Sequence, residues 1–171
     1  MQKYIITGGP SAGKTALLRE LGSRGIYIIE EAAKNVIFKE QKNGMKEPWL
    51  KKDFQEKILD LQLKREGGIP SDKDIVVIDR GVPDGLAYYK HRNQEVPKEL
   101  LESIAKCEYK KIFFLERLPD YEKTCFRAEE EEEAQRVSNL IKQTYKELGY
   151  EIIMVPSVSV KERAEFVLKN L

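Results

Sequence analysis

The sequence predicts an α/β fold in which helices cover both faces of a parallel sheet. Five short apolar runs alternate along the 171 residues with longer amphipathic stretches, and this alternation is typical of βαβ units. The runs are apolar throughout rather than at every second residue, as expected for strands buried on both faces. The predicted strands are Lys3–Thr7, Ile26–Glu30, Ile75–Asp79, Lys111–Leu115 and Glu151–Val155.

The spacing of apolar residues also predicts helices between the strands. The longest is expected over Pro48–Glu66, with Pro48 in its first turn and Gly67 just beyond its end. Its buried stripe is expected to contain residues three or four apart, namely Leu50, Phe54, Ile58 and Leu61. Two later helices are expected, one from an acidic first turn at 130–133 to Gly149, and one that begins at a capping box of Ser159 and Glu162.

The composition predicts a single domain over residues 1–171, because domains usually have about 100–200 residues. Lys and Arg number 30 and Asp and Glu number 29, which gives a net charge of +1. No nucleic-acid partner is expected, since such proteins carry a basic excess. A hydrophobic content of 41% excludes an acidic disordered chain. No apolar run approaches the roughly 20 residues of a membrane span.

A cytoplasmic location is expected. The chain begins Met1-Gln2-Lys3 and continues directly into a predicted strand, which leaves no room for a signal peptide. Cys107 and Cys125 lack C-x-x-C spacing, so both are expected to be reduced structural residues. His91, the only histidine, lies in a polar stretch and is expected to be exposed.

The strongest chemical signal lies between the first predicted strand and the helix that follows it. The residues Gly8, Gly9, Pro10, Ser11, Ala12, Gly13, Lys14 and Thr15 match G-x-x-x-x-G-K-[ST] at every fixed position. Such glycines let backbone N–H groups converge on an anion, and the helix start adds its positive dipole end. We therefore expect the loop to bind ATP, or GTP, with Lys14 on the β- and γ-phosphates and Thr15 on Mg²⁺. The alternative is a glycine-rich turn that binds no phosphate.

Asp79 is the expected second ligand of Mg²⁺. It ends a predicted strand, and ligands of parallel α/β sheets bind at the carboxyl ends of the strands. The alternative is that Asp79 only caps the next turn. Residue 80 is Arg, whereas motor-type and AAA-type ATPases usually carry an acidic residue there, and no N-K-x-D guanine motif occurs. These features disfavour a protein evolved for hydrolysis.

Motifs spread over nearly the whole chain resemble those of nucleoside and nucleotide kinases. They are Glu30-Glu31, Pro48-Trp49, Phe54-Gln55, Asp79-Arg80-Gly81-Val82-Pro83-Asp84, Leu148-Gly149-Tyr150 and Val155-Pro156. With the phosphate loop, they make the chain similar to the predicted-ATPase group of P-loop proteins related to the nicotinamide riboside kinase domain of NadR, and to deoxynucleoside kinases. The resemblance implies a P-loop NTPase fold, a three-layer sandwich with strand order 2-3-1-4-5 and a lid around 116–133.

The resemblance also implies phosphoryl transfer to an unidentified small, nucleoside-like acceptor. Glu30 or Glu31 would be the general base, and only one should face the cleft because neighbours on a strand point to opposite sides. The alternative is a carboxylate pair stabilised by a helix dipole. Arg80 would hold the acceptor or a phosphate, or instead pair with Asp84. Arg127 in the lid would cover the transferring phosphate, or instead pair with nearby glutamates.

Four residues are candidate acceptor contacts: Trp49, Phe54, Gln55 and Asp84. The alternatives are aromatic residues that belong to the core and a solvated Gln55. Two other functions stay open, a nucleotide-binding module without catalysis and a slow NTPase that needs no acceptor. The sequence predicts no oligomeric state.

Overall fold

The computed structural model describes residues 1–116 and 131–171, and five parallel strands form its central sheet. The strands are β1 (Gln2–Gly8), β2 (Tyr27–Ile29), β3 (Ile75–Asp79), β4 (Lys111–Leu115) and β5 (Ile152–Val155). Their order is β2-β3-β1-β4-β5, so the predicted fold class and strand order are confirmed. β3 and β4 have the predicted bounds, and each of the other strands differs by one residue at one or both ends.

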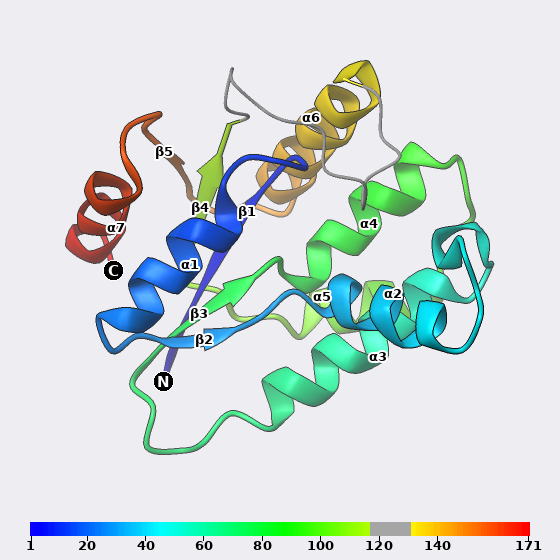
Figure 1. Cartoon of the computed structure of the whole chain (residues 1–171), viewed down its shortest axis with the longest axis horizontal. Helices are drawn as coiled ribbons and strands as arrows, with labels where there is room; N and C mark the ends of the chain where they lie inside the picture. The colour runs from blue at the N-terminus through cyan, green and yellow to red at the C-terminus, as the bar shows by residue number, and fades with distance from the viewer. Residues whose placement is uncertain (117–130) are drawn as a thin grey trace.

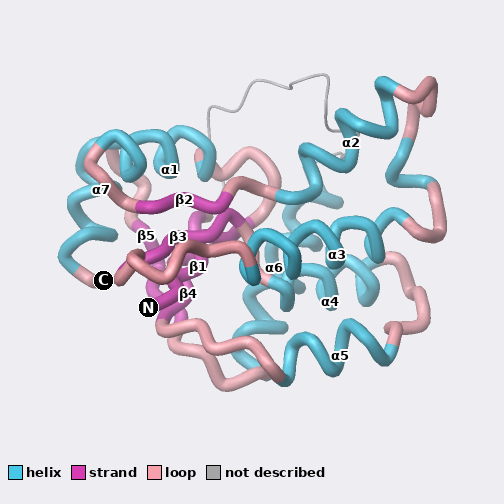
Figure 2. The backbone as a smooth tube through the Cα atoms, turned by 90° about the horizontal axis from the view of Figure 1, so that it is seen from below, coloured by secondary structure: helices cyan, strands magenta, loops and turns pink. Residues whose placement is uncertain are grey.

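Helices cover both faces of the sheet and complete three layers (Figures 1 and 2). One face carries α1 (Lys14–Ser23) and α7 (Val160–Lys169), and the other carries α4 (Val82–His91) and α6 (Glu131–Glu147). The remaining helices, which extend away from the sheet in Figure 2, are α2 (Ala32–Lys42), α3 (Phe54–Gly67) and α5 (Lys98–Ala105). In the described part of the chain, no helix combines the length and apolar character needed to cross a membrane.

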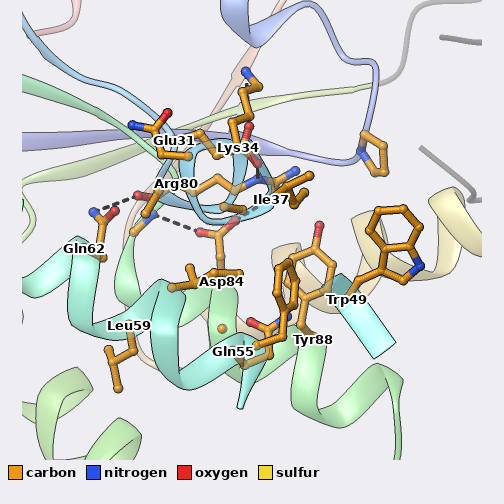
Figure 3. A pocket seen from close by; sticks show the side chains of 18 of the residues that line it. Glu31, Lys34, Ile37, Trp49, Gln55, Leu59, Gln62, Arg80, Asp84 and Tyr88 are labelled. Atoms are coloured by element: carbon orange, nitrogen blue, oxygen red, sulfur yellow. Dashed lines mark hydrogen bonds and ion pairs between the residues drawn. The ribbon is translucent and has the colours of Figure 1, made fainter. Parts of the chain in front are cut away.

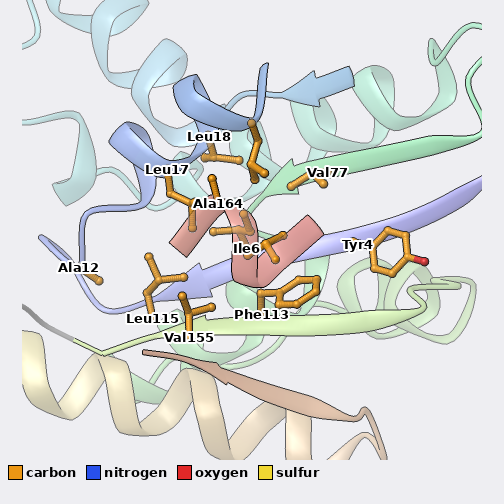
Figure 4. Close-up of a cluster of buried hydrophobic side chains, with 12 residues drawn as sticks. Tyr4, Ile6, Ala12, Leu17, Leu18, Val77, Phe113, Leu115, Val155 and Ala164 are labelled. Carbon is orange, nitrogen blue, oxygen red and sulfur yellow. The ribbon is translucent and has the colours of Figure 1, made fainter. Parts of the chain in front are cut away.

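Neighbouring residues of each strand point to opposite faces of the sheet and pack into two separate hydrophobic cores. In β1, for example, Ile6 packs toward α1 and α7, whereas Ile5 packs toward α4 and α6. Figure 4 shows the first core, which contains Tyr4, Ile6, Ala12, Leu17, Leu18, Val77, Phe113, Leu115, Val155 and Ala164. Burial on both faces explains why these strands are apolar throughout.

The single long helix predicted over Pro48–Glu66 is wrong. The chain forms a 3-10 turn over Pro48–Leu50, becomes extended at Lys51 (φ −72°, ψ 142°) and only then enters α3. Leu50 is 71% exposed rather than part of a buried stripe. Gly67 is the last helical residue, and Gly68 follows as the C-cap.

The buried face of α3 also differs from the predicted stripe. It consists of Phe54, Gln55, Leu59 and Gln62. Two of these residues are glutamines, and Gln62 donates a hydrogen bond from Nε2 to the carbonyl oxygen of Arg80 at 3.2 Å. Apolar spacing could not identify this face, because half of it is polar and hydrogen-bonds or lines a cavity instead of joining the core.

The two later helices agree with their predicted signals. The helix α6 buries Val137, Ile141 and Tyr145, and the chain turns at Gly149 (φ +80°) just beyond its end. At the start of α7, Ser159 and Glu162 form the predicted capping box. Cys107 is a half-buried free thiol. Cys125, Arg127 and most of the predicted lid at 116–133 lie outside the described residues.

Candidate functional site

A cavity of about 1670 Å³ opens beside the phosphate loop and extends between α2, α3 and α4. It exceeds the roughly 300–1,000 Å³ of a typical ligand pocket, so two small molecules have room to lie next to each other. Most of the predicted site residues line it, namely Pro10 to Thr15, Glu31, Trp49, Phe54, Gln55, Arg80 and Asp84 (Figure 3). Glu30 is exposed and Asp79 is buried at the end of β3, and neither is among the residues that line this cavity.

The shape of the phosphate loop depends on glycine at two positions. Gly8 has φ +140° and Gly13 has φ +83°, both in the region that residues with a Cβ rarely adopt. A Cβ at Gly8 would also lie 2.1 Å from the carbonyl oxygen of Leu115 on β4. Gly13 is the N-cap of α1, so the N–H groups of the first helical turn, which have no partner within the helix, lie at the loop. This geometry suits an anion.

Lys14 adds a positive charge inside the same loop. Its side chain is buried, and Nζ donates hydrogen bonds to the carbonyl oxygens of Gly8 (3.2 Å) and Gly9 (2.7 Å). A buried ammonium beside the N-terminal end of a helix creates a local positive field. The charge of Lys14 and the start of α1 therefore both favour an anion at this loop.

Oxygen ligands from three elements converge next to this loop. Thr15 lies at the start of α1, Glu31 is the N-cap residue of α2, and Asp79 ends β3. The ammonium of Lys34 on α2 contacts all three, with Nζ 2.8 Å from Thr15 Oγ1, 3.2 Å from Glu31 Oε2 and 3.8 Å from Asp79 Oδ2. Sequence reasoning missed Lys34, although its position three residues after Glu31 places both on one helix face.

These residues fit a Mg²⁺ ion. Asp79 Oδ1 is buried and accepts no hydrogen bond from the described residues, so it retains a free ligand position. Hydroxyl and carboxylate oxygens are ligands that Mg²⁺ prefers, and the ion usually completes its shell with water and substrate phosphates. The described residues contain no group of three or more His, Cys, Asp or Glu side chains that could hold a metal alone. This composition suits a metal that is shared with a nucleotide.

The environment of Asp79 disfavours its ionised form. Burial, followed by the nearby charge of Glu31, raises the pKa of Asp79 from its ordinary 3.8 to about 6. The folded protein therefore binds this proton more tightly than the unfolded chain does. The charged carboxylate destabilises the metal-free fold at neutral pH, and this cost disappears as the pH falls through 6 toward 4.

We expect Asp79→Asn to stabilise the metal-free, nucleotide-free protein at pH 7, by up to about 3 kcal/mol for a pKa difference of this size. The gain should shrink steadily as the pH is lowered to 4.5, where the folded parent already carries the proton. Urea denaturation in EDTA at both pH values measures the difference. A variant that is no more stable than the parent at pH 7 would contradict the assigned environment.

Arg80 forms the centre of a buried ion-pair cluster (Figure 3). Its Nε donates to Glu31 Oε1 at 2.9 Å and its Nη1 donates to Asp84 Oδ1 at 3.0 Å. The backbone of Arg80 is left-handed (φ +66°), which is uncommon for a residue other than glycine. Its amide donates to Ile6 O at 3.0 Å, and its carbonyl accepts from Gln62. The backbone strain at Arg80 is thus held by hydrogen bonds from two neighbouring elements.

The charge of Arg80 is secured by its surroundings. Burial alone would lower the pKa of its guanidinium, but Tyr88, Glu31 and Asp84 together raise that pKa above its ordinary value. The guanidinium is therefore charged at neutral pH. It presents a fixed positive charge next to the cavity that the phosphate loop also lines.

Asp84 is more completely engaged than an acceptor contact would be. Its Oδ1 accepts from Thr7 and Arg80, and its Oδ2 accepts from the Gly81 amide at 3.1 Å and the Tyr145 hydroxyl at 2.6 Å. The ion pair between Arg80 and Asp84, the alternative raised from the sequence, is therefore present. This geometry indicates that Asp84 positions Arg80, and it disfavours the predicted direct contact between Asp84 and an acceptor.

The structure separates the two candidate bases. Glu31 is buried and lines the cavity, whereas Glu30 is exposed and its carbonyl accepts a hydrogen bond from Arg65 at 2.6 Å. The strand β2 ends at Ile29, so Glu31 occupies the N-cap position of α2 without a side-chain cap hydrogen bond. Of the two glutamates, only Glu31 lines the cavity, and the cause is the start of α2 rather than the predicted alternation along a strand, because neither residue lies in β2.

Aromatic residues form the wall of the cavity away from the phosphate loop. Trp49 and Tyr88 lie along this wall (Figure 3), and Arg92 on α4 donates from Nη1 to the Trp49 carbonyl oxygen at 2.5 Å. Gln55 is buried, which excludes the solvated alternative, and Phe54 is buried beside it. The predictions did not include Tyr88, because its neighbours in the sequence resemble those of any amphipathic helix.

The prediction of an exposed His91 is wrong. Its side chain is half-buried at the cavity, with Nε2 3.0 Å from Glu133 Oε1. The reason is tertiary, since α4 packs against α6 and brings Glu133 next to the end of α4.

The strand order, the left-handed phosphate loop and the adjoining carboxylates define a P-loop nucleotide-binding protein with a kinase-like fold. The chain belongs to the AAA domain family, whose model matches residues 3–163. In this chain Asp79 is followed by Arg80. Comparison with curated proteins returns no match.

Solved structures of kinases share the fold. NadR in complex with NR has a TM-score of 0.76 and 21% identity, over 99% of this chain and 51% of that chain. Deoxyadenosine kinase from M. mycoides, with products dCMP and a flexible dCDP bound, has a TM-score of 0.70 and 16% identity, over 99% and 98%. Thymidylate kinase from Candida albicans has a TM-score of 0.64 and 15% identity, over 99% and 90%.

The chain spans about half the length of the NadR chain that it matches. NadR has also been solved with NAD and AMP-PNP, and the deoxyadenosine kinase with dATP. Together with the family match, these neighbours confirm the resemblance that the sequence motifs indicated.

Proposed function

We propose that the chain is a single-domain phosphotransferase that transfers a phosphoryl group from ATP, or GTP, in the presence of Mg²⁺ to a small nucleoside-like acceptor. The observation that carries this proposal is the shared cavity. The phosphate loop lines it together with the buried Glu31–Arg80 pair and an aromatic wall. The cavity extends beyond the loop to this pair and to the aromatic wall, which leaves room for a second substrate beside the nucleotide.

Each residue group has a distinct role in this proposal. Lys14 and the amides of the loop would bind the triphosphate, and Thr15 and Asp79 would hold Mg²⁺, which neutralises phosphate charge when bound. Glu31 would accept the proton of the acceptor hydroxyl, while Arg80 holds the Glu31 carboxylate and offers charge to the acceptor. Positioning and charge stabilisation would supply most of the rate enhancement.

The aromatic wall supports the nucleoside-like part of the proposal. Trp49, Phe54 and Tyr88 offer ring faces, and the Gln55 amide offers both a donor and an acceptor for the edge of a base. A covering role for Arg127 and a cytoplasmic location stay predictions.

Nucleotide turnover measured with and without a panel of nucleosides and other ribosides tests the proposal. Production of ADP that depends on one acceptor class supports the kinase. Tight ATP binding without turnover would instead show a binding module, and turnover that ignores every acceptor would show an NTPase.

Separate replacement of Glu30 and Glu31 by glutamine tests which of them is the general base. We expect Glu31→Gln to lower kcat by about 10²–10⁴-fold on a confirmed acceptor, which is the usual contribution of a general base. Glu30→Gln is the matched control, because Glu30 is exposed and outside the residues that line the cavity. Equal turnover in both variants and the parent would remove Glu31 from the proposed mechanism.

A further inference from the structure

Lys34 lies at this site, but neither the motifs nor the proposed mechanism gives it a role. It lies in the first turn of α2, and its side chain is 44% exposed. Its ammonium nevertheless reaches into the cluster of oxygens formed by Thr15, Glu31 and Asp79. These atoms come from three separate elements, so the contact is a property of the assembled site and not of one helix.

The ammonium of Lys34 and a divalent cation would compete for the same oxygens. Lys34 Nζ lies 2.8 Å from Thr15 Oγ1 and 3.8 Å from Asp79 Oδ2, whereas Mg²⁺ binds oxygen at about 2.0–2.1 Å. A cation that draws the two side chains in to that distance leaves no room for the ammonium between them. The flexible four-carbon stem and partial exposure of Lys34 allow the ammonium to leave toward solvent or toward a bound phosphate.

The negative charges of Glu31 and Asp79 explain how the contact with Lys34 would affect binding. In the nucleotide-free protein, Glu31 and Asp79 place two carboxylates close to the phosphate loop, where their negative charge would repel the phosphates of a nucleotide. Lys34 neutralises part of this charge, and the described residues alone offer no complete set of metal ligands.

We propose that Lys34 is an internal counter-ion that occupies the divalent-cation position of the nucleotide-free protein, so that the metal binds together with the triphosphate and not before it. The part concerning nucleotide rests on the proposed function. The competition between Lys34 and a bare divalent cation does not, because it requires neither turnover nor an acceptor.

Binding of Mn²⁺ alone, followed by the electron spin resonance signal of the free ion, tests the competition directly. The parent should bind Mn²⁺ weakly without nucleotide, and Lys34→Met should bind it at least tenfold more tightly. Lys39→Met is the matched control, because Lys39 lies on the exposed side of the same helix and is not among the residues that line the cavity. Lys34→Arg retains the charge and should stay close to the parent.

A second variant localises the gain. Adding Asp79→Asn to Lys34→Met should abolish the tighter Mn²⁺ binding. A gain that survives this addition lies elsewhere in the protein and overturns the proposal, as does equal Mn²⁺ affinity of Lys34→Met and Lys39→Met. Circular dichroism confirms folding, and Lys34→Gln replaces Lys34→Met if the latter does not fold.

ATP binding in EDTA gives an independent readout. Without metal, Lys34→Met should bind ATP at least fivefold more weakly than the parent, because the carboxylates of Asp79 and Glu31 then lie near the phosphates without the charge of Lys34. With saturating Mg²⁺ the difference should vanish, and an equal loss in both conditions would overturn the counter-ion role. If the protein transfers no phosphate to any acceptor but the Mn²⁺ results hold, the proposed function fails and this inference stands.

Discussion

Replacing Lys14 by alanine is expected to weaken the binding of Mg·ATP by about 1.5–3 kcal/mol, the usual contribution of a hydrogen bond to a charged group. This corresponds to a loss of roughly 10- to 150-fold in affinity. The effect is large because Lys14 is buried within the loop, where its charge is poorly screened by solvent. The backbone amides of the loop remain in the variant, so some binding should persist.

Isothermal titration calorimetry with a non-hydrolysable ATP analogue measures this loss. Lys42→Ala is the control, because Lys42 is an exposed lysine at the end of α2 that does not line the cavity. Lys14 also holds two loop carbonyls, so Lys14→Met, which retains most of the aliphatic stem, should be measured alongside. Unchanged affinity in both Lys14 variants would show that the loop does not bind the triphosphate.

The second large effect concerns stability. Arg80→Met is expected to lower the free energy of unfolding by about 3–5 kcal/mol, because removing one partner of a buried ion pair leaves an uncompensated charge. Here two carboxylates, Glu31 and Asp84, lose their shared cation. The exposed pair of Arg24 and Glu20 provides the comparison, and Arg24→Met should cost only about 0.2–1 kcal/mol.

A double-mutant cycle distinguishes the loss of stability caused by the lost charge interaction with Glu31 from the loss caused by removing the packing of the Arg80 side chain. Adding Glu31→Gln to Arg80→Met removes one of the two carboxylates that have lost the Arg80 guanidinium, so part of the lost stability should return. Urea denaturation of the parent, the two single variants and the double variant at pH 7 supplies the cycle. If the two substitutions are strictly additive, Glu31 and Arg80 do not form the coupled pair that the structure describes.

Much of this architecture follows from local sequence. The predicted bounds of β3 and β4 agree with the structure, because strands covered on both faces must be apolar at every residue. The phosphate loop is equally local, since glycine at positions 8 and 13 is required by left-handed backbone within one short segment.

The predictions that failed are those that depended on neighbours in space. The break after Leu50 and the polar buried face of α3 follow from packing around the cavity, and His91 is half-buried because α6 supplies Glu133. Apolar spacing reports only which face of an element avoids water. It cannot report that a glutamine is buried by a partner from another element.

By itself, the sequence determined the layered α/β fold, the order in which the elements follow one another and the identity of the phosphate loop, because each depends on residues adjacent in the chain. Only the tertiary structure decided that Glu31 and not Glu30 faces the cavity, that Asp84 supports Arg80, and that Lys34 contacts oxygens of Thr15, Glu31 and Asp79. The physical reason is distance along the chain. Arg80 and Glu31 are 49 residues apart, and Asp84 and Tyr145 are 61 apart, so these contacts exist only after the sheet has brought the carboxyl ends of its strands together.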